Sequence, residues 1–241
     1  MELLPEDCVA HILSFTSPID VCRVSLISSI VKSMADSDNV WEKFLPHNYQ
    51  GIVSRLVDPP LSCSSKKELL ARLCKPQLID DGNKMFSIEK TTGKICYSLS
   101  ARQLSITFGN NPLHWSWRQV QGSRFAEVAE LRTICYLETI GSINNEMLSP
   151  KTMYGAYLKV KNVECAYGLD LLPCIRSNCK RNGICNCEHK DEWLEIELGS
   201  FYTEKVQVQE VRMCLKEVNG VDFKGRLIVD GIELRPKTYR L

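Results

Sequence analysis

The chain has 241 residues, of which 44% are hydrophobic and 24% are charged, and this ordinary composition excludes a disordered or collagen-like chain. Its 30 Lys and Arg residues are almost balanced by 29 Asp and Glu residues. The net charge of +1 gives no chain-wide attraction to nucleic acid or to an acidic membrane, so we expect neither as a partner.

The first residues of the chain and its apolar runs predict the cellular location of the protein. Acids and a proline in residues 2–7 stand where a secretory signal needs basic residues and a longer apolar run. No apolar run approaches the roughly 20 residues that a membrane-spanning helix needs. We therefore expect a cytoplasmic or nuclear protein, built as one large or two ordinary domains.

Residues 3–46 predict three or four short helices. Val9, Ile12 and Leu13 recur at the spacing of one helix face. The run Ser17-Pro18-Ile19-Asp20 has the N-cap, the N1 proline and the N3 acid of a helix start. A module this small buries little apolar surface by itself. We therefore expect it to need a partner.

This helical stretch resembles an F-box, the segment that docks onto the Skp-type adaptor of a cullin ubiquitin ligase. The resemblance is carried by residues 4–7, 12–13 and 21–25, and by the closing block 36–46 around Trp41. It implies an F-box over residues 1–47. It also implies that six apolar residues bury against the adaptor or support the helices that do: Leu4, Pro5, Ile12, Leu13, Val24 and Trp41. The alternative is that these residues form only a small helical core.

Residues 48–84 predict a helical linker. The stretch 58–62, with two prolines, indicates a connection, and Ser64 to Leu73 predicts one capped helix that ends before Pro76. From residue 85 the pattern changes to short strands, beginning with a hairpin of residues 86–88 and 95–99 around a turn at Gly93.

Further strands are expected along the rest of the chain. In residues 193–198 the period is two, with Leu194, Ile196 and Leu198 on one face. Because no helical crossovers separate the strands, we expect an antiparallel β-sandwich over residues 85–241, and an α+β multidomain protein overall. The other predicted strands are residues 135–140, 154–160, 206–218 and 227–234.

Three aromatic side chains, Phe108, Trp115 and Trp117, stand within ten positions around a turn. Planar apolar rings with a polar rim suit a sugar, whose C–H face stacks on an aromatic ring. In a strand, Trp115 and Trp117 point the same way. The alternative is that these rings belong to the buried core.

Residues 85–238 resemble the phloem protein two family, which includes the tobacco lectin Nictaba. The motifs lie along the whole stretch, and include Leu104-Ser105-Ile106-Thr107, Leu148-Ser149-Pro150-Lys151-Thr152 and Trp193-Leu194-Glu195-Ile196-Glu197-Leu198-Gly199. The resemblance implies a jelly-roll-like domain that binds N-acetylglucosamine-containing glycans. An F-box joined to this domain is a known plant combination.

In the lectins of this family, two tryptophans and two glutamates are implicated in glycan binding, and by motif they correspond to Phe108, Trp115, Glu210 and Glu217. Phe108 replaces a tryptophan, so it keeps a stacking face but loses ring area and an N–H donor. The two glutamates retain carboxylates that accept hydrogen bonds from sugar hydroxyls. Their alternative is a solvated strand face.

Twelve cysteines are too few for a disulfide scaffold, which needs roughly 8–10% of the residues. Cysteine behaves as a small hydrophobe, so we expect six buried thiols: Cys8, Cys22, Cys74, Cys96, Cys135 and Cys214. A second group has the donors of a tetrahedral zinc site but not its paired spacing, so we expect a polar surface loop and no metal. This group is Cys174, Cys179, Cys185, Cys187 and His189, with Cys165 upstream.

Catalysis is not expected, because the four histidines accompany no nucleophile motif and the chain has no P-loop or dinucleotide fingerprint. We therefore interpret the chain as a non-catalytic, cofactor-free substrate receptor of a cullin ubiquitin ligase, with a glycan or glycoprotein as its target. Two alternatives stay open. One keeps the adaptor but binds a protein target without glycan, and the other is a free cytosolic lectin.

Overall fold

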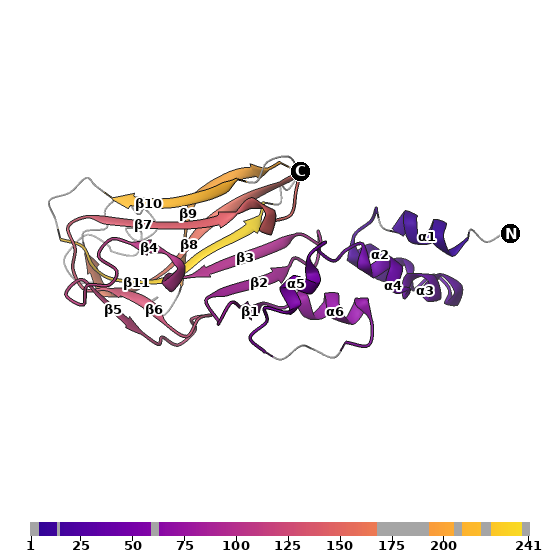
Figure 1. Ribbon diagram of the computed structural model, residues 1–241, viewed down its shortest axis with the longest axis horizontal. Helices are drawn as coiled ribbons and strands as arrows, with labels where there is room; N and C mark the ends of the chain where they lie inside the picture. The colour runs from indigo at the N-terminus through magenta and orange to yellow at the C-terminus, as the bar shows by residue number, and fades with distance from the viewer. Residues whose placement is uncertain are drawn as a thin grey trace. The chain divides into compact units, whose positions relative to one another are not determined.

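The computed structural model describes residues 5–13, 15–58, 63–167, 193–204, 209–217 and 223–237. The chain divides into two compact units. The first, here called the helical unit, contains Met1–Asp81 and Met85–Cys96. The second, here called the β unit, contains Gly82–Lys84 and Tyr97–Leu241. Figure 1 shows the elements of both units along the chain.

The helical unit begins with short capped helices, as the sequence predicts. Ser17 is the N-cap of its second helix and accepts a hydrogen bond from the Asp20 amide (3.1 Å), with Pro18 at the first helical position. Ser65 caps the last helix in the same way. The helices are α1 Glu6–Leu13, α2 Pro18–Val24, α3 Ser29–Ala35, α4 Asp38–Glu42, α5 Tyr49–Val53 and α6 Lys66–Leu73.

The core of this unit gathers around Val21, Val40 and Trp41, all of them buried. The Trp41 indole donates its Nε1–H to the Ala35 carbonyl (2.6 Å), which satisfies its one polar atom. Helix α6 packs against α4. Two strands follow, β1 Gln77–Ile79 and β2 Lys84–Ile88, and the predicted hairpin of β2 with β3 Ile95–Ser100 is confirmed.

The β unit consists of two antiparallel sheets. Strand β11 lies at the centre of the larger sheet, where it pairs with β3 and β6 along one edge and with β8 along the other. Strand β5 extends the sheet beyond β6, and β9 extends it beyond β8. The smaller sheet has the order β10-β7-β4. The strands are β4 Ser105–Ile106, β5 Trp115–Arg118, β6 Val128–Leu131, β7 Leu137–Asn144, β8 Thr152–Tyr167, β9 Leu194–Thr203, β10 Glu210–Glu217 and β11 Gly225–Pro236.

The two sheets pack face to face over an apolar core. A Cβ atom built on Gly141 of β7 would lie 2.8 Å from Cδ1 of Ile232 on β11, so the side chains of the larger sheet reach the backbone of the smaller one there. Leu227, Val229 and Leu234 of β11 are also fully buried. The predicted class, helices followed by an antiparallel β domain, is confirmed. Within the described ranges, no helix is both long and apolar enough to cross a membrane.

The prediction that six cysteines are buried thiols was wrong. Cys8, Cys22, Cys135 and Cys214 are exposed, and Cys74 and Cys96 are partly exposed. The physical reason is local: Cys22 and Cys214 each follow a buried residue, Val21 and Met213. Successive side chains of a strand point to opposite faces, so the position after a buried Met213 faces water.

Candidate functional site

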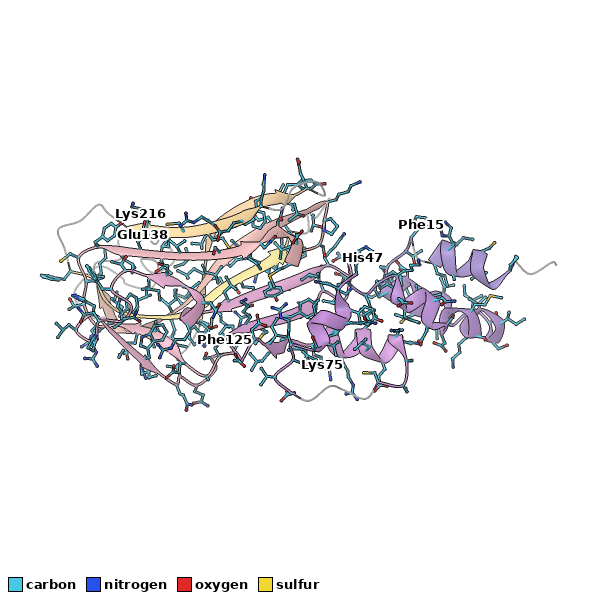
Figure 2. All side chains as sticks on the ribbon, in the orientation of Figure 1. Phe15, His47, Lys75, Phe125, Glu138 and Lys216 are labelled. Carbon is cyan, nitrogen blue, oxygen red and sulfur yellow. The ribbon has the colours of Figure 1, made fainter. Side chains whose placement is uncertain are left out.

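The helical unit exposes large apolar side chains at its N-terminal end. Leu26 is 85% exposed in the loop between α2 and α3, and Phe15, labelled in Figure 2, is 77% exposed after α1. Helices α1 and α2 both contact α3, so these side chains come from neighbouring elements. The whole set, here called the F-box face, is Ile12, Phe15, Leu26, Ile27 and Ile30.

Ten large apolar residues are exposed in the described part of the chain, and five of them form the F-box face within 19 residues of sequence. Exposed apolar side chains that gather in this way indicate a protein-binding site. Single exposed apolar residues carry no such meaning.

The six predicted adaptor residues divide into two kinds. Pro5 and Ile12 are exposed, so they are placed to contact a partner, and Val24 is partly exposed. Leu13 and Trp41 are buried and hold the helices together. Leu4 lies outside the described residues. Sequence reasoning missed four residues of the F-box face, because they lie in loops or break the one-face helical spacing: Phe15, Leu26, Ile27 and Ile30.

The second candidate site lies in the β unit, at the loop that connects β4 with β5. Phe108 is 60% exposed and has a positive φ of 53°, which is uncommon for a bulky residue. Its ring centroid is 5.3 Å from that of His114, and His114 Nδ1 lies 2.8 Å from the Thr133 carbonyl. The loop therefore holds Phe108 in place with its ring open to solvent.

Trp115 has a different environment. It is 2% exposed, and its Nε1–H donates to the Thr107 carbonyl (2.9 Å). Neither face of its ring is open to a ligand, so in this structure Trp115 is a core residue that anchors the Phe108 loop. Trp117 anchors the same loop by donating to the Gly109 carbonyl (3.2 Å), and the two indoles point the same way, as predicted.

The two glutamates lie at opposite ends of β10. Glu210 pairs with Asn144 of β7 and Glu217 pairs with Leu137, and seven residues of strand correspond to about 23 Å. Thr107 donates its backbone N–H to the carbonyl of Glu138, next to Leu137, so Phe108 lies near the Glu217 end. The structure therefore brings the backbones of Phe108 and Glu217 to one end and leaves Glu210 at the other.

Further side chains accompany Phe108 at this end of the β unit. Lys216, labelled in Figure 2, pairs with Glu138 (3.4 Å), and the hydrogen bond that its ammonium donates to Tyr136 raises the pKa of Lys216. Leu113 and Phe223 are exposed on loops whose backbones are linked through residues 132–134. We call Phe108, Leu113 and Phe223 the loop surface.

Comparison with known proteins decides the family. The F-box domain matches residues 1–43, and the Phloem protein 2 domain matches residues 94–236. The chain belongs to the phloem protein 2 family of F-box proteins. It is 42% identical to F-box protein VBF of Arabidopsis thaliana, over 99% of this chain and 100% of that protein. It is also 42% identical to the Arabidopsis thaliana F-box protein PP2-B13, over 98% and 99% of the two chains.

Membership of this family confirms both resemblances that the sequence indicated. An F-box domain implies an Skp-type adaptor as partner, and F-box proteins are in general non-catalytic subunits. The two halves of this F-box protein each expose an apolar surface, the F-box face and the loop surface.

The predicted cysteine and histidine group of this family member, Cys174 to His189, lies outside the described residues. In the parts of the chain that the structure describes, no three potential metal ligands come together.

Proposed function

We propose that this F-box protein is the substrate-recognition subunit of a cullin ubiquitin ligase. The F-box face docks the Skp-type adaptor, and the phloem protein 2 domain binds the target. The chain supplies no chemistry of its own. It raises the effective concentration of target lysines near a ubiquitin-charged enzyme. The observation that carries this proposal is the F-box face, because exposed apolar side chains of this extent need a covering partner.

Replacing Leu26 by aspartate should weaken retention of the adaptor at least about 30-fold, because a buried carboxylate replaces an apolar contact of hot-spot size. The measurement is co-purification of the full chain with the adaptor, followed by titration of the purified partners. Leu113→Asp is the matched control, since Leu113 is 73% exposed in the β unit. It should retain the adaptor at wild-type strength. A folded wild-type chain that never retains the adaptor would refute the ligase proposal and favour a free lectin.

For the target, our first candidate is a glycan or glycoprotein. The exposed face of Phe108 supports it, since an aromatic ring held open to solvent stacks on a sugar. The backbone of Glu217 lies at the same end, and the Lys216–Glu138 pair adds fixed polar groups.

The second candidate is a protein surface without glycan. Two observations favour it: Trp115 is buried in the core, and Glu210 lies at the far end of β10. Only part of the glycan-binding set is therefore gathered at the loop surface. Leu113 and Phe223 add exposed apolar area that suits a protein partner better than a sugar.

Glycan-array binding of the adaptor complex separates the two candidates. If a glycan is the target, wild type binds selectively and Phe108→Ala loses at least about tenfold in affinity, the scale of one stacked ring in a desolvated site. Glu210→Gln is the matched control and should bind as wild type does, because Glu210 lies about 23 Å from Glu217 along β10. A folded wild type that binds no glycan would leave the protein target as the better proposal.

A further inference from the structure

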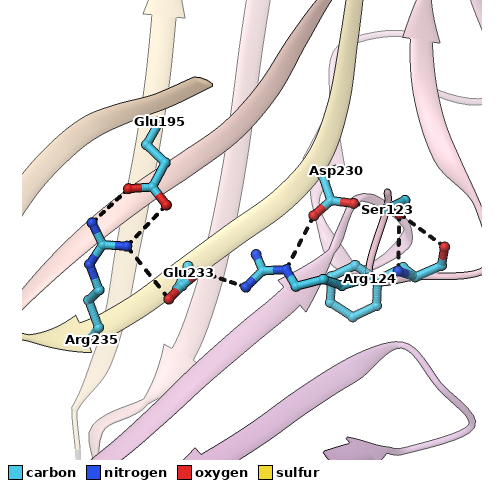
Figure 3. Close-up of polar contacts among 7 residues, drawn as sticks. Ser123, Arg124, Glu195, Asp230, Glu233 and Arg235 are labelled. Atoms are coloured by element: carbon cyan, nitrogen blue, oxygen red, sulfur yellow. Dashed lines mark hydrogen bonds and ion pairs between the residues drawn. The ribbon is translucent and has the colours of Figure 1, made fainter. Parts of the chain in front are cut away.

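A network of charged side chains lies on the face of the larger sheet that points away from the apolar core. On β11, Asp230, Glu233 and Arg235 alternate with the buried apolar residues. Asp230 is nevertheless 0% exposed, because the segment between β5 and β6 covers it. From that segment Ser123 donates its Oγ–H to Asp230 Oδ1 (2.6 Å), and Arg124 donates Nη1–H to Glu233 Oε2 (2.6 Å), as Figure 3 shows.

One half of this network is fully matched. Arg235 donates two hydrogen bonds to Glu195 of β9 (3.0 and 2.6 Å), and its guanidinium lies 4.0 Å over the Tyr157 ring. The bond to Arg235 lowers the pKa of the Glu195 carboxyl. In Figure 3 this pair lies beside Glu233, which links it to Arg124. None of the buried side-chain polar atoms that the structure describes in this half lacks a hydrogen-bond partner.

The other half, around Arg124 and Asp230, contains polar atoms without a hydrogen-bond partner. Five buried side-chain polar atoms lack a hydrogen-bond partner in the described part of the chain, and four of them are here. Arg124 Nε and Asp230 Oδ2 are 3.5 Å apart but not aligned for a hydrogen bond. The other two are Arg124 Nη2 and Trp193 Nε1. A buried donor that is left unpaired destabilises the fold.

Lys159 of β8 adds a further unmatched donor to this half. Within the described ranges its ammonium makes no hydrogen bond or ion pair, and lies 5.4 Å from the Trp193 ring centroid. Burial, and then the charge of Arg124, lower the pKa of Lys159. The cations Arg124 and Lys159, which repel each other, thus lie with the Trp193 indole N–H in one partly buried cluster. Proteins use such an arrangement to hold an acceptor-only group.

We propose that Arg124, Lys159 and Trp193 form a binding site for a carboxylate group. The unmatched atoms are three donors and one acceptor, and the Lys159 ammonium adds to the donors, so the guest supplies acceptors. The three cations Arg124, Lys159 and Arg235 are balanced by Asp230, Glu233 and Glu195, so the cluster is neutral, and these carboxylates repel a doubly charged phosphate more strongly than a singly charged carboxylate. A single negative charge is the better fit.

Entry to this site involves the turn at Gly122. Gly122 has a positive φ of 79°, and a Cβ atom built on it would lie 3.2 Å from Trp193 Nε1. The turn therefore covers the indole N–H, and a carboxylate that reaches it lifts the turn. Arg124 keeps 23% of its side-chain surface, but its Nε and Nη2 atoms are buried, so a guest reaches them only when the covering turn moves.

Nuclear magnetic resonance of the full chain bound to its adaptor tests this inference, which does not depend on the nature of the target. The chain has four tryptophans, and Trp193→Phe identifies the Trp193 indole N–H resonance. Sodium acetate should shift that resonance saturably, while acetamide, its neutral analogue, and inorganic phosphate should not. The capped peptide acetyl-Gly-Glu-Gly-amide shows whether the carboxylate comes from a protein side chain or a small molecule, by binding more or less tightly than acetate.

Lys159→Met should weaken acetate binding about tenfold, the loss of one charge-assisted hydrogen bond, without breaking any ion pair of the described chain. Lys151→Met is the matched control, since Lys151 is an exposed lysine of the same unit that precedes β8. It should leave acetate binding unchanged. The inference is overturned if acetate shifts no indole resonance of the folded complex, if acetamide binds equally, or if Lys159→Met binds like wild type.

Discussion

Trp115→Ala should destabilise the β unit by about 3–5 kcal/mol, the usual effect of truncating a buried tryptophan. The ring is 2% exposed, so its removal leaves a cavity between β5 and the core. It also removes the donor to the Thr107 carbonyl, one of the two indole bonds that hold the Phe108 loop. Denaturant unfolding of the full chain, followed by tryptophan fluorescence and circular dichroism, measures the change.

Two variants control this experiment. Trp115→Phe keeps most of the ring and loses the N–H donor, so it should destabilise the protein by about 1–2 kcal/mol. Phe108→Ala removes an exposed ring and should change stability by less than about 0.5 kcal/mol. If Trp115→Ala is as stable as wild type but has lost a ligand, the indole is a binding surface and its burial here is incorrect.

The elements that sequence reasoning predicted well depend on neighbouring residues. The cap at Ser17 and the proline at the first helical position are both local, and each is found where the sequence places it. The alternation of Leu194, Ile196 and Leu198 is local too, and β9 buries Ile196 while it exposes the glutamates on either side. Periodicity thus predicted which segments are helices and strands.

Exposure on the F-box face could not be predicted in this way. Apolar periodicity assigns an apolar residue to a core, and it does not distinguish a core within one chain from a surface that a second chain covers. Leu26 and Ile27 lie in a loop, where no period applies. The same limit made Cys22 and Cys214 look buried, since a thiol counts as apolar whichever way it points.

The site residues of the β unit depend on contacts between distant parts of the chain. The burial of Trp115 depends on its pairing with Leu131, and its hydrogen bond depends on a loop eight residues earlier. Ser123 and Asp230 are 107 residues apart in the sequence. The separation of Glu210 from Glu217 was different, because seven residues on one predicted strand already imply about 23 Å.

Gly231→Ala should prevent the β unit from folding, or destabilise it by more than about 4 kcal/mol, well beyond an ordinary substitution. Gly231 has a positive φ of 157° at a bulge of β11, and a Cβ atom there would lie 1.9 Å from the Leu99 carbonyl oxygen of β3. Because that oxygen belongs to the backbone, no side-chain rotation relieves the clash. Soluble yield and urea unfolding of the full chain bound to its adaptor measure the effect.

Gly199→Ala separates the clash from the cost of the backbone conformation. Gly199 also lies at a bulge, with a φ of 150°, but nothing lies within 4 Å of a Cβ atom built on it. Its replacement should cost only about 1–3 kcal/mol, the price of an unusual φ alone. The difference between the two variants therefore measures how closely β11 approaches β3 at the centre of the larger sheet. Equal effects would mean that the two strands are further apart than this structure has them.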